Sequence, residues 1–289
     1  MRTHSTIFLS ILVMMIVMGS ASCDLINPEE QIPGFIRIDS ISINPVSGEG
    51  TDMHDIVDAW VYDNEQLVGV YELPAVVPIL TTGEANIRIR PGIKLNGQVG
   101  VRSVYLFLED YVGTVEIFED SVVTINPNLP FKSATEFPWL EEFETPSQIT
   151  LSSTSLSQEN VSIISGEEAF EGNSAKLSLA TGQDFFECKS NGEFDLPSAG
   201  ATVLLEFSYK GNFPLTISMI SGNAGGSVQT PIILLSETDE WKHIYVSLTE
   251  TASTLFQANE HQPVFGFVRN DDSDEELNVY LDNIRLTHF

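Results

Sequence analysis

Cys23 is the residue whose type and setting predict the most specific chemistry in this sequence. It follows the small residues of segment 18–22 (MGSAS), which in turn follow an apolar run at residues 7–18 with a positively charged start in front. A positive segment, a short apolar segment and small residues before a cleavage point make up a secretory signal peptide. A cysteine at the new end of the chain offers a thiol that can be acylated. We therefore expect residues 1–22 to be removed and Cys23 to carry lipid.

Two other interpretations of this segment remain open. A transmembrane helix needs about 20 mostly apolar residues, and the run at residues 7–18 is shorter. An ordinary secretory signal would leave Cys23 as a free thiol. Acyl chains would anchor the protein by burying methylene groups at about 0.8 kcal/mol each, with residues 23–34 as a tether. We expect the outer membrane, on its cell-surface or periplasmic face, although Asp24 acts as an inner-membrane retention signal in some Gram-negative bacteria.

The histidines and serines show no catalytic pattern. The 5 histidines are scattered, and neither a His-Glu-x-x-His pair nor a Gly-x-Ser-x-Gly elbow occurs. A glycosidase needs two opposed carboxylates, but the sequence cannot single out a pair among 41 acidic side chains. His54 lies close to Asp52 and Asp55, which a polar turn before Trp60 explains as well as a metal would. We therefore predict a non-catalytic protein.

The charge of the chain excludes one class of partner. With 41 acidic and 13 basic side chains the net charge is −28, so the surface repels phosphate backbones and nucleic-acid binding is excluded. Solubility explains most of this charge, and calcium is the partner that acidic loops could recruit. With Cys23 acylated, Cys188 could form no internal disulfide. Beside Glu187 it is expected to be a buried hydrophobic side chain rather than a reactive thiol.

The elements that would position these residues are strands. Short segments of alternating polarity recur between Gly, Pro, Asn and Asp, without heptads, tandem repeats or long helical periodicity. This predicts an all-β protein of two β-sandwich domains, a small sandwich at residues 35–126 and a jelly roll at residues 139–289. Residues 127–138, which hold three prolines, would be the linker.

The expected strands of the first domain begin with residues 35–43, where a phase slip suggests a bulge near Ser40. The other expected strands lie at residues 57–62, 67–71, 85–90, 101–108, 114–118 and 122–125, and, in the second domain, 148–153, 161–165, 175–180, 184–189, 203–209, 215–220, 229–235, 241–248, 264–268 and 277–286, with a short helix at 251–258.

The first domain carries a resemblance to known families. Segments 60–69 (WVYDNEQLVG), 72–74 (ELP), 78–80 (PIL) and 87–92 (IRIRPG) follow one another, with Gly83 between the last two. This order resembles the PEGA-type surface-layer module, an Ig-like sandwich, with Asn64 in place of the commoner glycine. The first half, notably 35–41 (FIRIDSI) and 91–97 (PGIKLNG), also resembles uncharacterised two-domain outer-membrane lipoproteins of Gram-negative bacteria. The resemblance implies a non-catalytic spacer or contact domain and an envelope address.

Four segments of the second domain resemble, by their order, the jelly-roll carbohydrate-binding modules with a galactose-binding-like fold. They are 142–144 (EFE), 170–177 (FEGNSAKL), 241–248 (WKHIYVSL) and 279–286 (VYLDNIRL). The resemblance implies that the first and last strands lie side by side and that a structural calcium ion is held between Glu144 and Asp282. Calcium takes roughly six to eight oxygen ligands. The alternative is that Asp282 and Asn283 only bulge the last strand and bond its backbone.

Sugar recognition by such a module would use exposed aromatic rings that stack on pyranose faces. Adjacent aromatic residues of one strand point to opposite sides, so one of Phe185 and Phe186 should face away from the core. Trp241 begins a strand, where packing at the core or rim is the alternative role. The candidate ligand-binding residues are Phe185, Phe186, Tyr209, Phe213 and Trp241.

Taken together, these patterns predict a lipid-anchored envelope or cell-surface protein that is not an enzyme. Through the C-terminal jelly roll it would bind a glycan, as an accessory to polysaccharide capture. The alternative is a structural or assembly lipoprotein that binds a protein partner in the cell envelope. An exposed aromatic platform would favour the glycan, and a broad apolar patch would favour the protein partner.

Overall fold

The structure is a computed structural model that describes residues 30–223, 225–255, 257–269 and 275–289. Within these ranges the chain forms strands, one short helix, α3 (Thr249–Thr254), and two 3₁₀ turns, η1 (Pro146–Gln148) and η2 (Gly166–Glu168). The predicted all-β class is confirmed. In the described part of the chain, no helix has the length and apolar character needed to cross a membrane. Cys23 and the predicted signal peptide lie outside the described residues.

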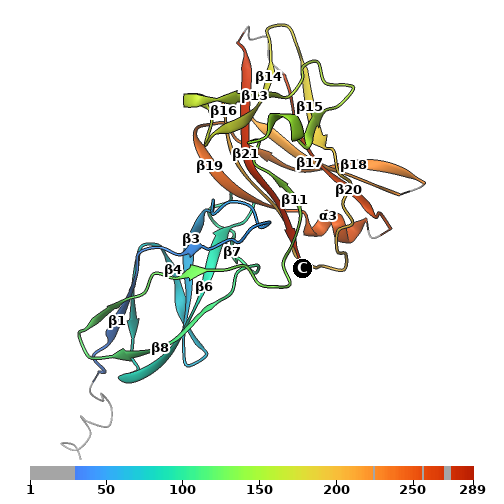
Figure 1. Cartoon of the computed structure of the whole chain (residues 1–289). Coiled ribbons are helices and arrows are strands. Elements are labelled where there is room, and N and C mark those ends of the chain that lie inside the picture. Colours follow the sequence, from blue (N-terminus) through green and yellow to red (C-terminus); the bar gives the residue numbers. More distant parts are fainter. Residues whose placement is uncertain (1–29, 224, 256, 270–274) are drawn as a thin grey trace, which may run out of the picture.

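The N-terminal part, blue to green in Figure 1, consists of three sheets. The largest has the order β4-β3-β6-β7, and β8 also pairs with β6; the smaller ones are β5-β1-β9 and β10-β2. The pairs β1–β9 and β2–β10 are parallel, so the end of this part returns beside its start. The bounds are β1 (Gly34–Ile38), β2 (Ser42–Ile43), β3 (Ile56–Asp63), β4 (Gln66–Glu72), β5 (Ala75–Ile79), β6 (Gly83–Lys94), β7 (Arg102–Val104), β8 (Tyr111–Ile117), β9 (Val122–Thr124) and β10 (Asn128–Leu129).

The PEGA-like stretch forms the hairpin that its sequence predicts. Strands β3 and β4 are joined by Asn64 and Glu65, which both have positive φ values of 47° and 64°. Two successive left-handed residues give the tight turn that matches the twist of paired strands, and Asn adopts this conformation readily. The bulge expected near Ser40 is instead a change of sheet, because β1 ends at Ile38 and the chain pairs again as β2 in another sheet.

The C-terminal part is a sandwich of two sheets (Figure 1). One has the order β13-β14-β21-β16-β19, with β11 paired to β21, and the other has the order β12-β15-β20-β17-β18. The bounds are β11 (Glu136–Glu141), β12 (Leu151–Ser153), β13 (Ser162–Ser165), β14 (Asn173–Leu179), β15 (Phe185–Ser190), β16 (Val203–Gly211), β17 (Leu215–Asn223), β18 (Gly226–Leu235), β19 (Thr238–Ser247), β20 (Glu260–Val268) and β21 (Leu277–His288).

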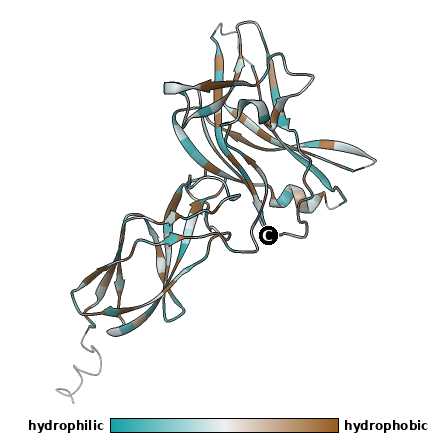
Figure 2. Ribbon diagram, viewed as in Figure 1, coloured by the Kyte–Doolittle hydropathy of each residue, from teal (hydrophilic) through white to brown (hydrophobic). Residues whose placement is uncertain are grey.

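Hydrophobic side chains fill each part, and apolar and polar residues alternate along the strands in Figure 2. The N-terminal core also takes in Leu204 and Tyr245 from the C-terminal sandwich. Leu129 and Phe131 are buried in the same core, and β11 begins at Glu136, so the predicted linker at 127–138 is packed against the N-terminal core and is partly strand. The two parts therefore share apolar side chains across their junction.

Strand β19 lies at an edge of its sheet, and the N-terminal part covers this edge. Leu95 forms a parallel bridge with Tyr245. The Asn96 amide N–H donates to the Tyr245 carbonyl at 2.7 Å, and the Ser247 N–H donates to Asn96 Oδ1 at 2.8 Å. Asn96 has a φ of 56°, and in this left-handed conformation its backbone and its side chain form hydrogen bonds with two residues of the same strand. An edge that would otherwise present unpaired amides is closed within the chain.

A buried carboxylate holds the two parts together beneath this edge. Glu206 is 1% exposed and accepts a hydrogen bond from the Tyr105 hydroxyl at 2.6 Å. Arg285 Nη1 lies 3.5 Å from the other Glu206 oxygen, and Nη2 of this guanidinium donates to the Thr51 carbonyl. Burial acts to lower the pKa of Arg285, but Glu206, Tyr105 and Tyr245 together outweigh it and the net direction is upward. Burial and the Glu206 charge raise the pKa values of Tyr105 and Tyr245, so both phenols stay protonated.

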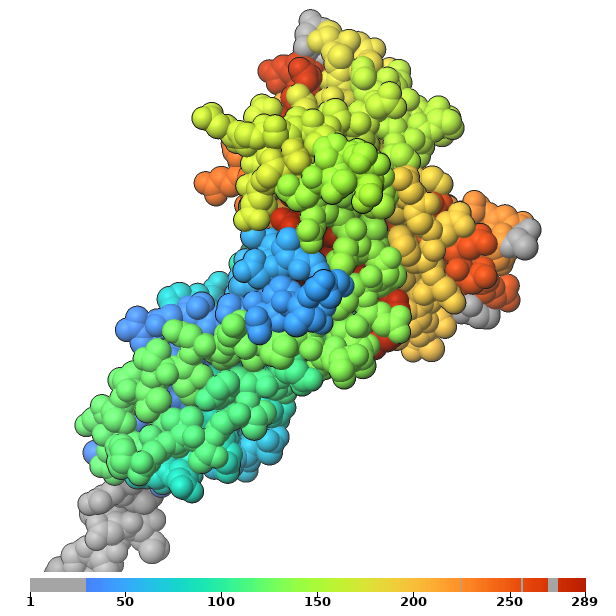
Figure 3. All heavy atoms as spheres, viewed as in Figure 1, coloured from blue at the N-terminus to red at the C-terminus, as the bar shows by residue number. Residues whose placement is uncertain are grey.

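The last residue and the segment before β3 complete the junction. The Phe289 ring packs on Phe107 with centroids 4.9 Å apart, and the Asp55 N–H donates to the Tyr245 hydroxyl at 2.8 Å. Figure 3 shows the blue segment between β2 and β3 lying against the C-terminal sandwich. The junction thus combines apolar packing, backbone hydrogen bonds and a buried ion pair.

We predict that Tyr105→Phe destabilises the protein by about 1–3 kcal/mol, because the buried Glu206 carboxylate loses its shortest hydrogen bond. The free energy of unfolding from urea titration measures this loss. Tyr111→Phe is the matched control, since the Tyr111 hydroxyl bonds no described residue, and its change should stay within about 0.5 kcal/mol. Equal values for the two variants would show that Glu206 does not depend on Tyr105.

Candidate functional site

A cleft of about 730 Å³ runs along the covered edge of β19. Its walls come from both parts of the molecule: residues 53–55 and the loop at 94–99 on one side, and β16, β19 and residues 233–237 on the other. The loop is fixed because Asn96 bonds β19 directly. Ligand sites in proteins commonly occupy about 300–1,000 Å³, so this cleft has room for a small ligand.

Aromatic rings form one end of the cleft. Trp241 and Phe170 both line it, with their ring centroids 5.3 Å apart in an edge-to-face arrangement. Tyr280 lies behind Trp241 at 6.3 Å. Lys210 Nζ is 5.2 Å from the Trp241 ring and 5.0 Å from the Tyr280 ring. These contacts hold the indole in one orientation while leaving it half-exposed.

Polar side chains surround the rest of the cleft. Asn96 and Gln98 offer amides, Asp55 and Glu237 offer carboxylates, and Lys94 and Lys242 offer ammonium groups, which makes both donors and acceptors available to a ligand.

Two histidines also line the cleft. Burial lowers the pKa of His54 and the His243 ring adds to the effect, so the His54 imidazole is neutral near pH 7. His243 Nδ1 is 3.2 Å from Ser208 Oγ, while its Nε2 is buried without a hydrogen-bond partner among the described residues, 4.0 Å from Glu206. His243 therefore connects the cleft to the buried carboxylate.

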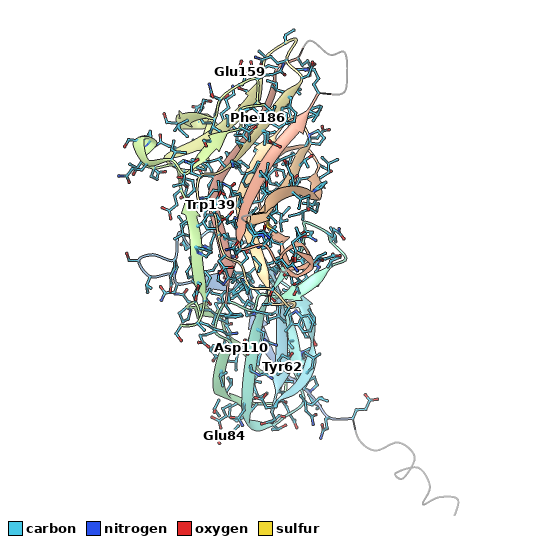
Figure 4. All side chains as sticks on the ribbon, turned by 90° about the vertical axis from the view of Figure 1, so that its right-hand side faces the viewer. Tyr62, Glu84, Asp110, Trp139, Glu159 and Phe186 are labelled. Atoms are coloured by element: carbon cyan, nitrogen blue, oxygen red, sulfur yellow. The ribbon has the colours of Figure 1, made fainter. Side chains whose placement is uncertain are left out.

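The structure brings two of the five predicted aromatic residues to this cleft. Trp241 and Tyr209 both line it, but Tyr209 is only 7% exposed and its hydroxyl donates to the Ser236 carbonyl at 3.2 Å. Phe186 is fully buried in the core, stacked on Phe267 and placed among the strands in Figure 4, so it is corrected from a ligand residue to a core residue. Phe213 packs against the same core beside Phe267.

Phe185 lies elsewhere, on the outer face of β15. As the alternation predicts, it points away from the core that holds its neighbour Phe186. Its strand partner Val268 is exposed. Further along this face, Gln229 donates to Glu187 and Lys189 donates to Gln262, both at 2.8 Å. This is a second row of polar side chains beside one half-buried ring, distinct from the cleft.

Glu144 and Asp282 converge on the turn at residues 171–174. The Asn173 N–H donates to Glu144 at 3.0 Å, and Ser174 Oγ donates to Asp282 at 2.5 Å. Asp282 also accepts from the Asn283 N–H at 2.7 Å. Asn283 has a φ of 49°, and β21 shifts register against β16 here, so the bulge described by the alternative interpretation is present.

The environment of Asp282 disfavours the ionised form of its carboxyl group. Asp282 is 2% exposed, and burial raises its pKa from 3.8 to about 6, with the Glu144 charge adding to the rise against the hydrogen bonds from Ser174 and Asn283. Two carboxylates of like charge that converge on one turn offer oxygen ligands of the kind a divalent cation takes. No group of three or more His, Cys, Asp or Glu side chains that could hold a metal occurs among the described residues.

One buried pair resembles part of a catalytic site, but it is structural. Ser221 Oγ lies 2.9 Å from His261 Nδ1 across β17 and β20, and both residues are at most 2% exposed. Burial lowers the pKa of His261, and the ring also bonds the Ala258 backbone. The pair is therefore buried and links two strands. Cys188 is likewise buried, and burial raises the pKa of its thiol well above the ordinary value, as expected for a hydrophobic role.

The sequence does not reveal that the loop at residues 94–99 lies against β19 and lines the cleft. Segment 91–97 (PGIKLNG) marks a turn by its Asn96-Gly97 pair, but nothing local shows that the turn lies against β19, about 150 residues later. Lys242 follows Trp241 directly and could have been added to the site on that ground alone. Phe170 begins the segment that carried the carbohydrate-binding resemblance, so its aromatic ring was also a signal.

No protein-family model and no curated protein matches the chain. Several solved structures of carbohydrate-binding modules are similar to the chain at low identity. The CBM22-2 xylan-binding domain from Paenibacillus barcinonensis is 12% identical, with a TM-score of 0.39 over 52% of this chain and 99% of that domain. The family 11 module of a Clostridium thermocellum cellulosomal cellulase is 16% identical, with a TM-score of 0.39 over 53% and 95%. A structure from the β-sandwich superfamily of such modules is 13% identical, with a TM-score of 0.37 over 90% and 99%.

The raised pKa of Asp282 makes its contribution to stability depend on pH. A carboxyl group with a folded pKa near 6 and an unfolded pKa near 3.8 stabilises the fold fully below pH 3.8, and this contribution is lost as the pH rises through 6. We predict that the stability of the wild type relative to Asp282→Asn falls by about 2–3 kcal/mol between pH 3.5 and 7.5. Urea unfolding at a series of pH values measures this difference.

Asp239→Asn is the matched control, since this side chain is exposed near the start of β19 and no described residue bonds it. A wild-type minus Asp282→Asn difference that stays flat across this pH range, or that follows the control, would show that Asp282 is not the group responsible.

Proposed function

We propose that this protein is a lipid-anchored envelope protein that binds a saccharide in the cleft along β19. One observation supports this above all others. A half-exposed tryptophan and a second ring stand at one end of a cleft whose remaining walls carry amides, carboxylates and ammonium groups. A serine, a histidine and a carboxylate do lie in line here, with His243 Nδ1 3.2 Å from Ser208 Oγ and Nε2 4.0 Å from Glu206. Ser208 and Glu206 are each only 1% exposed, so this hydroxyl presents almost no surface to a ligand, and the arrangement is better suited to binding than to catalysis.

The physical chemistry of sugars fits this arrangement. A pyranose ring has apolar C–H faces, which pack on indole, and a rim of hydroxyl groups, which need paired donors and acceptors. Trp241 supplies the apolar surface, while Asn96 and Gln98 supply amides that donate and accept. Fixing Asn96 through its bonds to β19 lowers the entropic cost of ordering this wall when a ligand binds.

The position of the cleft suits an anchored protein. Strand β1 begins at the end of the molecule opposite the C-terminal sandwich (Figure 1). A lipid on Cys23, joined through the tether at residues 23–34, would leave the PEGA-like N-terminal sandwich as a spacer and direct the cleft away from the outer membrane. Polysaccharide outside the lipid surface would then reach the cleft.

A calcium ion between Glu144 and Asp282 belongs to the same proposal. The like charges of the two carboxylates and the raised pKa of Asp282 support a cation that would relieve their repulsion. Carbonyl groups of the adjacent turn could complete the oxygen ligands. The ion would tie the start of the sandwich to β21 and so stabilise the fold without entering the cleft.

The second candidate function is the binding of an envelope protein. The outer face of the sheet β5-β1-β9 carries Val76 and Val122, each 56% exposed, and Phe118 and Leu80 lie near its end at 56% and 58%. Exposed apolar side chains gathered on one face are a common feature of protein contact surfaces. This face lies on the N-terminal part and is separate from the cleft.

We predict that Trp241→Ala weakens saccharide binding at least tenfold, a loss of at least about 1.4 kcal/mol, because the main apolar surface of the cleft is removed. A glycan array identifies the ligand, and isothermal titration with the purified protein measures its affinity. Phe185→Ala and Phe213→Ala are the matched controls, since these rings are half-buried outside the cleft.

The controls decide between two sites. If Phe185→Ala abolishes binding and Trp241→Ala does not, the saccharide lies on the outer face of β15 and the cleft is wrong. If no saccharide is retained, while an envelope protein co-purifies and is lost on Val76→Lys with Val122→Lys, the protein-binding candidate replaces the proposal.

For the cation, we predict that millimolar calcium raises the melting temperature and that a chelator lowers it, since a ligand of the folded state alone must stabilise that state. Glu144→Gln and Asp282→Asn should each abolish the calcium response. Glu142→Gln, two residues from Glu144 on the same segment, should keep it. A melting temperature that does not respond to the chelator would exclude calcium at this pair.

A further inference from the structure

Lys94 and Lys242 are the unusual basic residues of this chain. Neither side chain has a hydrogen-bond or ion-pair partner among the described residues, and both line the cleft along β19. Every other described lysine and arginine has one. The lysines at 132, 176, 189 and 210 bond a carbonyl, a carboxylate or an amide oxygen, and the arginines at 37, 88, 90, 102, 269 and 285 bond carboxylates or carbonyls.

This arrangement is unexpected from composition. The chain has 41 acidic side chains and 13 basic ones, so most lysines are expected to lie within ion-pair distance of a carboxylate. Both unpartnered lysines instead line the same cavity, as do Trp241 and Asn96. An ammonium group that no protein group has neutralised can bind an anionic group of a ligand at little cost, because no existing ion pair must break.

The other charged groups of the cleft limit what the ligand can be. Asp55 and Glu237 line it as well, and carboxylates accept hydrogen bonds from hydroxyl groups. Burial keeps His54 neutral near pH 7, and Lys210 is held over the Trp241 and Tyr280 rings with a bond to the Glu168 carbonyl. The cleft thus presents two free cations, two acceptors for hydroxyls and an aromatic surface.

We propose that the ligand of the cleft is an acidic saccharide, a sugar that carries a carboxylate or phosphate group bound by Lys94 and Lys242. This inference rests on the proposed saccharide-binding function and names the class of sugar. The aromatic end contacts the ring face, the carboxylates and amides take the hydroxyls, and the ammonium groups take the anion. A free phosphate or carboxylate without the sugar lacks the apolar contact and binds more weakly.

Isothermal titration with three probes tests the proposal on the purified protein. The probes are a galacturonic acid trisaccharide, the neutral galactose trisaccharide of the same linkage, and glucose 1-phosphate. We expect the galacturonic acid trisaccharide or the sugar phosphate to bind at least about tenfold more tightly than the neutral sugar. The acidic probe that binds more tightly identifies the anion as carboxylate or phosphate.

Lysine variants locate the anion. Lys94→Gln and Lys242→Gln should each weaken the acidic probe about tenfold and leave the neutral probe unchanged. Lys176→Gln is the matched control, since its ammonium group pairs with Glu276 away from the cleft, and it should change neither. Circular dichroism and the melting temperature confirm that the variants fold.

The possible failures are distinguishable. If the neutral sugar binds as tightly as the acidic ones and Trp241→Ala abolishes all of them, the acidic class is wrong and the saccharide function stands. If the acidic probe binds but the lysine variants bind it like the wild type, the anion is not held by these lysines. If no probe and no array saccharide binds, the function and the inference both fail.

Discussion

The buried carboxylate of Glu206 is the constraint on which the junction, and with it the cleft, depends. An ionised carboxylate removed from water must find compensating donors, and Glu206 is 1% exposed. Its partners come from both parts of the molecule: Tyr105 of the N-terminal part donates a hydrogen bond, and Arg285 of the last strand forms an ion pair at 3.5 Å. Separating the two parts would leave this charge without Tyr105 and would expose the shared apolar core around Tyr245.

A joint of this kind fixes geometry as well as stability. The same residue that shares the N-terminal core, Tyr245, pairs with Leu95 and Asn96 along the edge of β19. Arg285 reaches in the other direction to the carbonyl of Thr51, just before residues 53–55 of the cleft wall. Both N-terminal walls of the cleft are therefore attached to strands of the C-terminal sandwich. These attachments fix the positions of the loop residues that form the wall, as a binding site requires.

The sequence predicts the strands well because their signals are local. Alternation and turn residues placed a strand at 203–209 and another at 277–286, and the structure has β16 at Val203–Gly211 and β21 at Leu277–His288. The same period separated Phe185 from Phe186 correctly, although it could not say which of the two faces the core. What it could not supply is which distant segments meet: the pairing of β10 with β2, the packing of Phe131, and the loop at Asn96 over β19.

Asp282 and the two cleft lysines share one property: each lacks a partner of opposite charge within the described part of the protein. Most of its charged network is satisfied: Glu206 has Tyr105 and Arg285, and the arginines of β6 pair with Asp110, in the lower part of Figure 4. Two kinds of group differ from these: the buried carboxylate of Asp282, whose pKa is raised, and the two cleft lysines, which pair with no described residue. A buried charge that has no partner of opposite charge lowers the stability of the fold. That loss has a physical explanation if a ligand of opposite charge supplies the missing partner, a cation at Asp282 and an anion at the lysines.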